Sequence, residues 1–108
     1  MGELLEGAFV YMLKCSDGAY YIGSYRGDDL NARIAEHNQG YRKSAWTYHR
    51  RPVELVWSEH FQRYADAVAT ERQIKGWSRA KKTALIDRDY ATISKLAKSK
   101  PKSRRPSS

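Results

Sequence analysis

Two tyrosines and a glycine near the start of the chain have the types and the spacing for proton transfer. Tyr11 lies ten residues before Tyr21, and Gly23 follows two residues after Tyr21. A phenol donates and accepts hydrogen bonds, and it acts as a base only where nearby cations lower its pKa from about 10. The alternative is that both rings only pack between strands. The two phenols are therefore candidates for chemistry, provided that cations lie close to them.

Charged side chains that suit a phosphate substrate follow on two expected helices. Arg33 and His37 are four positions apart, so both project from one side of a helix. The planar fork of an arginine donates two hydrogen bonds to phosphate. Glu71 supplies one carboxylate, which is enough for an ion such as Mg²⁺ that keeps several waters. The same spacings also fit ordinary helix ion pairs, Arg33 with Glu36 and Glu71 with Lys75.

The register of a predicted hairpin decides whether the two tyrosines share a face. Residues 8–15 are rich in aromatic and β-branched types and predict a strand, and residues 19–24 predict the returning strand. With a three-residue turn over 16–18, Tyr11 stands opposite Gly23, and both tyrosines lie on one face. A two-residue turn would place them on opposite faces. In the first register the glycine leaves space beside the Tyr11 ring, which we expect a substrate to enter.

The other elements follow as a helix, a strand and further helices. Residues 30–39 predict a helix that ends at Gly40. Residues 53–58 predict a third strand, and the chain beyond is expected to be helical over 64–77, after a cap at Ser78, and towards residue 97. The order β-β-α-β-α-α-α predicts an α+β fold with a small three-stranded antiparallel sheet flanked by helices.

Length, charge and cysteine content limit the kind of protein. The chain has 108 residues, so we expect one domain over residues 1–97, because a second core would have too few residues. Residues 98–108 hold five cations of a chain whose formal charge is +8, and they hold no acid. They predict a flexible basic tail, which attracts polyanions. A lone cysteine, Cys15, excludes an intramolecular disulfide, and no apolar run approaches the roughly 18 residues that cross a bilayer. We therefore expect a cytoplasmic protein with no membrane partner.

Residues 41–52, which precede the third predicted strand, are rich in basic and aromatic side chains. They mix cations with rings that can stack, as surfaces that bind nucleic acid do. The alternative is a solvated loop whose tryptophan closes over the core. Together with Arg26, the candidate contacts to nucleic acid are Arg42, Lys43, Trp46, Arg50 and Arg51.

Over residues 8–86 the chain resembles the GIY-YIG nuclease superfamily, most closely its small stand-alone bacterial members. Four features of the family have counterparts in this chain: two signature tripeptides, a helix with an arginine and a His-Asn pair, and a segment with a glutamate. They are Phe9-Val10-Tyr11, Tyr21-Ile22-Gly23, the helix with Arg33, His37 and Asn38, and the segment around Glu71. The chain departs from the pattern where Phe9 replaces a glycine. It departs again where Ser24 replaces the cation that often follows the second tripeptide, for which Arg26 is the candidate substitute.

The resemblance implies an endonuclease that hydrolyses phosphodiester bonds in DNA with one divalent ion, Mg²⁺ or Mn²⁺. Glu71 would hold the ion, and Arg33 would stabilise charge on the scissile phosphate. Tyr11 would help to activate the attacking water, and Tyr21 would orient the water or the phosphate. His37 would assist as a proton acceptor or a phosphate contact.

Two other functions remain open from the sequence. A non-catalytic nucleic-acid-binding module on the same scaffold would carry the same residues in a geometry too loose to cut. A protein-interaction domain that uses the helical C-terminal half would show little affinity for polyanions at physiological salt. Only the distances between the side chains separate these functions.

Overall fold

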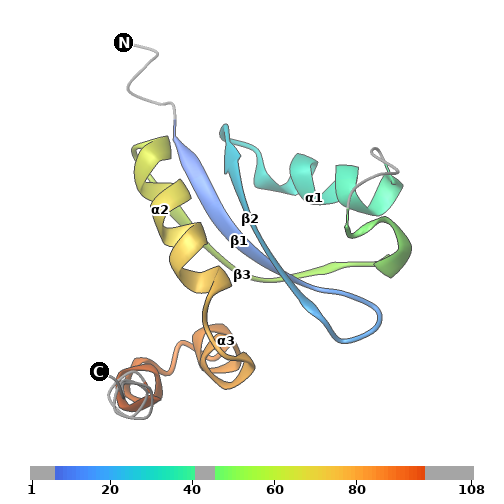
Figure 1. Cartoon of the computed structure of the whole chain (residues 1–108). Coiled ribbons are helices and arrows are strands. Elements are labelled where there is room, and N and C mark those ends of the chain that lie inside the picture. The colour runs from blue at the N-terminus through green and yellow to red at the C-terminus, as the bar shows by residue number, and fades with distance from the viewer. Residues whose placement is uncertain (1–6, 41–45, 97–108) are drawn as a thin grey trace. The chain divides into compact units, whose positions relative to one another are not determined.

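The computed structural model of the chain describes residues 7–40 and 46–96, and its elements follow the predicted order (Figure 1). They are β1 (Ala8–Lys14), β2 (Tyr20–Arg26), α1 (Leu30–Gln39), the 3-10 helix η2 (Tyr48–Arg50), β3 (Glu54–Phe61), α2 (Tyr64–Lys75) and α3 (Arg79–Ile86). Residues 90–96 are also helical. The α+β class is confirmed. Within the two described ranges, no helix is long and apolar enough to span a membrane.

The hairpin of β1 and β2 has the register that a three-residue turn requires. Tyr11 pairs with Gly23 in the antiparallel ladder. Gly18 closes the turn with a φ of +88°, in the left-handed region that glycine adopts without a steric penalty. Because side chains alternate along a strand, Tyr11 and Tyr21 lie on the same face of the sheet, as predicted.

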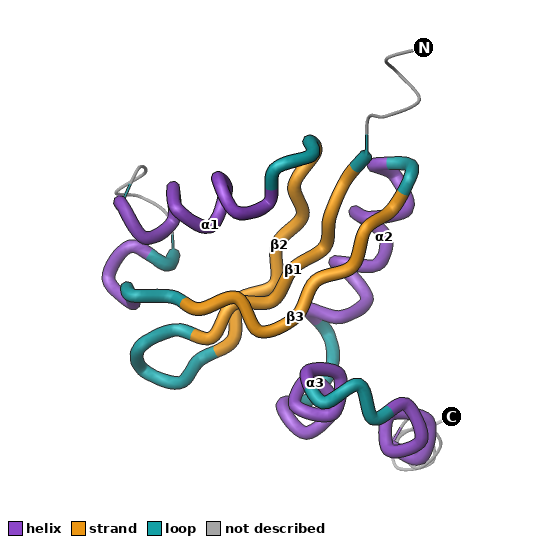
Figure 2. The backbone as a smooth tube through the Cα atoms, turned by 180° about the vertical axis from the view of Figure 1, so that it is seen from behind, coloured by secondary structure: helices purple, strands orange, loops and turns teal. Residues whose placement is uncertain are grey.

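The sheet has the strand order β2-β1-β3, with β1 in the centre and both neighbours antiparallel to it (Figure 2). On one face Tyr11 and Leu13 of β1 form a buried cluster with Leu30 of α1, and the partly buried Ile34 of α1 packs against it. This cluster fixes α1 against the face that carries the two tyrosines. Burial of such side chains is the main favourable term in folding.

The other face of the sheet is covered by α2. Val10 of β1 stands opposite Ser24 of β2, so both side chains point to this second face. The Ser24 hydroxyl donates a hydrogen bond to Glu71 of α2, and Ala67 and Ile74 of α2 are buried. Figures 1 and 2 show α1 and α2 on opposite sides of the sheet.

The end of α1 is fastened to the start of β3. The Asn38 side chain accepts from the Val53 amide at 2.7 Å and donates to the Val53 carbonyl at 3.0 Å. Gly40 follows the helix with a φ of +71°, which ends it where predicted. The structure thus gives Asn38 a structural contact. The β3 strand itself runs to Phe61, three residues beyond its predicted end.

The described chain separates into two compact units, Met1–Lys75 and Gly76–Ser108. The sheet, α1 and α2 belong to the first unit. In the second unit, α3 begins at the predicted cap, where the Ser78 hydroxyl accepts from the Lys81 amide at 3.2 Å. A single domain over residues 1–97 stays a prediction, and the basic tail over 98–108 lies outside the described residues.

Candidate active site

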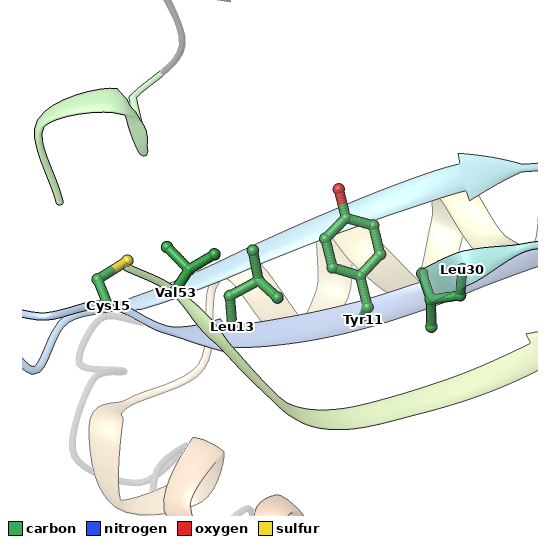
Figure 3. Packing of buried hydrophobic residues seen from close by; sticks show 5 residues of the cluster. All are labelled: Tyr11, Leu13, Cys15, Leu30 and Val53. Atoms are coloured by element: carbon green, nitrogen blue, oxygen red, sulfur yellow. The ribbon is translucent and has the colours of Figure 1, made fainter. Parts of the chain in front are cut away.

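Tyr11 is the central side chain of the site. It is fully buried on the middle strand, and its hydroxyl lies 3.0 Å from Nε2 of His37 on α1. Figure 3 shows the phenol rising from β1 with its hydroxyl pointing away from the strand. The ring centroid of Tyr21 is 6.3 Å from that of Tyr11 and 5.4 Å from that of His37. The two phenols and the imidazole therefore form one cluster on the α1 face.

The space beside Gly23 is filled by Tyr11 itself. A Cβ atom at Gly23 would lie 2.6 Å from the Tyr11 hydroxyl oxygen and 3.0 Å from Cε2 of Tyr21. Any larger residue would therefore push the phenol out of place. The expectation that a substrate enters this space was wrong, because the glycine makes room for the phenol to cross the β2 backbone.

The pKa of Tyr11 lies above the ordinary value of a phenol. Burial raises the pKa of Tyr11 to about 12, although Arg33 lowers it as a hydrogen-bond donor and as a positive charge. The charges of Tyr21 and Glu71 add to the rise. Desolvation disfavours the ionised phenol, and one arginine does not outweigh it. The Tyr11 phenol is therefore neutral at physiological pH.

His37 is held from both ring nitrogens. Its Nε2 faces the Tyr11 hydroxyl, and its Nδ1 lies 3.0 Å from Oγ1 of Thr47. Burial, followed by the positive charge of Arg33, lowers the pKa of His37 below its ordinary value of 6.5. The imidazole is therefore neutral at neutral pH and has one nitrogen lone pair available for a proton.

Arg33 faces the same phenol from α1. Its Nη1 forms an ion pair with Glu36 at 3.2 Å, so the ordinary helix pair that the sequence left open is present. The guanidinium also lies 5.9 Å from the centroid of the Tyr25 ring. Within the described part of the chain, Arg33 Nε is buried and has no hydrogen-bond partner. Buried donors without a partner are uncommon in folded proteins.

Glu71 is an oriented, ionised carboxylate. Its Oε1 accepts from the Ser24 hydroxyl at 2.6 Å, and its Oε2 lies 2.7 Å from the Lys75 ammonium. Burial opposes ionisation of Glu71, but the hydrogen bonds from Lys75 and Ser24 outweigh it and lower its pKa. The side chain is 15% exposed, so solvent still reaches it.

These properties suit one divalent ion of the magnesium type. Each carboxylate oxygen has lone pairs for more than one partner, so both oxygens of Glu71 retain coordination capacity. Across the described residues, no three His, Cys, Asp or Glu side chains gather in one place. An ion held by Glu71 would therefore keep most of its ligands as water, which is the usual binding mode of Mg²⁺.

The two halves of the site meet at the edge strand β2. Gly23 and Ser24 are neighbours, and their positions face opposite sides of the sheet. The Tyr11 phenol crosses β2 at Gly23, and Glu71 is held at Ser24. The charge of Glu71 contributes to the raised pKa of Tyr11, so the carboxylate acts on the phenol across this strand.

Comparison with known proteins identifies the fold family. Residues 7–84 match the GIY-YIG catalytic domain. The chain belongs to the GIY-YIG family. UPF0213 proteins of Staphylococcus aureus strains Mu50 and N315 are each 42% identical to it over 82 residues, covering 76% of this chain and 96% of theirs. The solution NMR structure of UPF0213 protein BH0048 from Bacillus halodurans is 35% identical, covers 75% of this chain and 83% of its own, and gives a TM-score of 0.48. These names state no activity.

In this GIY-YIG protein an aromatic stack borders the site. Trp46 stacks on Tyr21 with 5.8 Å between centroids and 22° between planes, and it is 45% exposed. The Arg50 guanidinium carbon lies 4.0 Å from the Trp46 centroid, and Arg50 Nε lies 3.1 Å from Oδ2 of Asp17. The structure therefore places Trp46 on Tyr21 and Arg50 on Trp46.

The other candidate contacts to nucleic acid lie elsewhere or outside the described residues. The Arg51 guanidinium carbon lies 4.1 Å from the Tyr48 ring centroid, and Arg51 donates to the Tyr48 carbonyl at 2.7 Å. Arg26 is exposed, and its guanidinium carbon lies 5.3 Å from the Tyr64 ring centroid. Its role as a substitute for the family's cation stays a prediction. Arg42 and Lys43 lie outside the described residues.

The sequence did not single out two residues that hold this site. Thr47 contacts His37 ten positions earlier, and Ser24 contacts Glu71 across 47 positions. For Ser24 there was a signal, because it occupies the place after the second tripeptide where the family often has a cation. For Thr47 there was none, because a threonine in a polar loop is ordinary.

Proposed function

We propose that this GIY-YIG protein is a divalent-metal-dependent endonuclease that hydrolyses phosphodiester bonds in DNA. One observation carries the proposal: a buried phenol is linked at 3.0 Å to a neutral imidazole beside a guanidinium. This combination supplies a proton path and a phosphate-binding cation at one point. Membership of the GIY-YIG family supports the same reaction class.

Tyr11 and His37 act together on the attacking water. The Tyr11 oxygen takes a proton from the water while the Tyr11 proton passes to Nε2 of His37. The step leaves hydroxide for attack on phosphorus, a neutral phenol and an imidazolium. The pKa of Tyr11, about 12, then presents no obstacle, because no tyrosinate has to accumulate.

The remaining side chains bind and orient the substrate. Arg33 contacts the phosphate oxygens and stabilises the charge that develops on them. Tyr21, packed between Trp46 and His37, keeps its hydroxyl beside the reacting phosphate. Glu71 holds the divalent ion, which supplies charge neutralisation at the phosphate and the leaving oxygen when bound.

The test is cleavage of labelled single-stranded, duplex and branched DNA with Mg²⁺ or Mn²⁺, and with a chelator. Cleavage should require the ion and fall by about 100-fold or more in H37A, R33A and E71Q. Gln73→Ala changes an exposed neighbour on α2 and should leave the rate unchanged. Ion-independent cleavage, or equal rates in all variants, would contradict the proposal.

The second candidate is a nucleic-acid-binding module without activity. The exposed Trp46 under Arg50 and the net charge of +8 favour it, since stacking and counterion release need no catalytic geometry. The same assay separates the two, because salt-sensitive binding without products is the expected outcome for the module.

A further inference from the structure

Thr47 has an unusual position for a polar loop residue. Only 1% of its surface is exposed, and its Oγ1 lies 3.0 Å from Nδ1 of His37. A buried hydroxyl is unfavourable unless it forms hydrogen bonds. The contact to His37 therefore accounts for a threonine at this place and links it to the phenol of Tyr11.

The direction of each hydrogen bond follows from the protons available. The guanidinium of Arg33 can only donate, so it cannot accept the Tyr11 proton. The buried Tyr11 proton then needs an acceptor, and Nε2 of His37 is 3.0 Å away. If Nε2 carried the imidazole hydrogen instead, this phenol proton would be left without that partner. A neutral His37 must consequently carry its hydrogen on Nδ1, facing the Thr47 oxygen.

We propose that Thr47 is a positioning residue for His37: its hydroxyl oxygen accepts the Nδ1 hydrogen and keeps the Nε2 lone pair directed at Tyr11. The consequence for catalysis rests on the proposed function, whereas the effect on the tautomer does not. Partners on the second ring nitrogen are a general means of selecting the reactive tautomer of a histidine.

The backbone around Thr47 is held by contacts that do not use its hydroxyl. Trp46 stacks on Tyr21, and the Thr47 carbonyl accepts from the Arg50 amide at 2.9 Å. Removing the hydroxyl should therefore leave the segment in place and act on His37 alone. Valine has nearly the shape of threonine without the hydroxyl, and serine keeps the hydroxyl.

The first measurement is the ¹⁵N NMR signature of the His37 ring in metal-free protein, above its pKa. Wild type and T47S should show a protonated Nδ1 and an unprotonated Nε2, whereas T47V should shift towards the Nε2-protonated form. If wild type already carries the hydrogen on Nε2, or if T47V equals wild type, the proposal is overturned. Should T47V not fold, T47A is measured in its place and read in the same way.

The second measurement is DNA cleavage by the same variants. T47V should lower kcat by about tenfold or more with little change in KM, and T47S should restore most of the rate. If wild type shows the expected tautomer but does not cleave, the proposed function fails and the role of Thr47 on the ring stands. If wild type cleaves and T47V keeps the wild-type kcat, the positioning role is overturned.

Discussion

The Tyr11 phenol is more stable in its protonated form in the folded protein than in the unfolded chain. Its pKa is about 12 when folded, against an ordinary value of 10. As pH rises, the unfolded chain therefore loses this proton first. The stabilisation is fully present below pH 10 and is lost as pH rises towards 12. Burial on the central strand is the cause, because it removes the water that would solvate a tyrosinate.

This difference predicts the alkaline behaviour of a Tyr11→Phe variant. Phenylalanine keeps the ring and cannot ionise, so its stability should fall less between pH 10 and 12. The free energy of unfolding of wild type should fall by about 2 kcal/mol more than that of Y11F over this range. Urea unfolding at a series of pH values measures the free energy of unfolding of both proteins. Tyr90→Phe, at an exposed tyrosine, controls for the loss of one hydroxyl, and parallel curves for wild type and Y11F would contradict the prediction.

At the scale of elements, the site depends on hydrogen bonds between segments that are distant in the chain. The Asn38 side chain at the end of α1 forms hydrogen bonds with both the amide and the carbonyl of Val53, which is buried just before β3. His37 precedes Asn38 directly, so the hydrogen bonds of Asn38 also fix the imidazole relative to the sheet. A rotation of α1 about its axis in either direction would separate His37 from Tyr11.

Asn38→Ala should therefore destabilise the fold. It leaves the Val53 amide and carbonyl without the partners they have now, at a cost of about 2 kcal/mol. Gln39→Ala, at the next and exposed position, should change stability by less than about 0.5 kcal/mol. Chemical denaturation compares the two variants. Equal stability of N38A and Q39A would show that water replaces both hydrogen bonds.

At the scale of the whole molecule, charge is concentrated at one end. Residues 98–108 carry five of the 20 cations, which leaves 15 cations against 12 acids, or +3, for residues 1–97. Each cation that contacts a DNA phosphate releases condensed counterions, so under the proposed function the tail should add affinity that falls steeply with salt. Such binding depends on charge and carries no sequence preference.

Deletion of residues 98–108 should leave the thermal unfolding midpoint unchanged and weaken DNA binding. The slope of log K against log salt should become shallower by about 4.5 if all five cations contact phosphates, since each contributes about 0.9. A tail of equal length with glutamine at the five positions controls for chain length. Unchanged affinity across the salt titration would show that the tail has no part in binding.

The hairpin register was predictable because it depends on local features. Alternation of side chains and a glycine suited to the left-handed region at position 18 are enough to place Tyr11 opposite Gly23. The pKa of Tyr11 was not predictable, because burial depends on α1 and on both neighbouring strands. The charge of Arg33 acts to lower this pKa, but desolvation has the larger effect.

By itself the sequence determined the order of the elements, the shared face of the two tyrosines and, through its motifs, the family. These follow from near-neighbour spacing and residue type, which any chain with this pattern carries. The tertiary structure alone decided that Thr47 holds His37, that Ser24 holds Glu71, and that the phenol fills the space at Gly23. Most of these contacts join residues on different elements, and their distances depend on how the helices pack against the sheet.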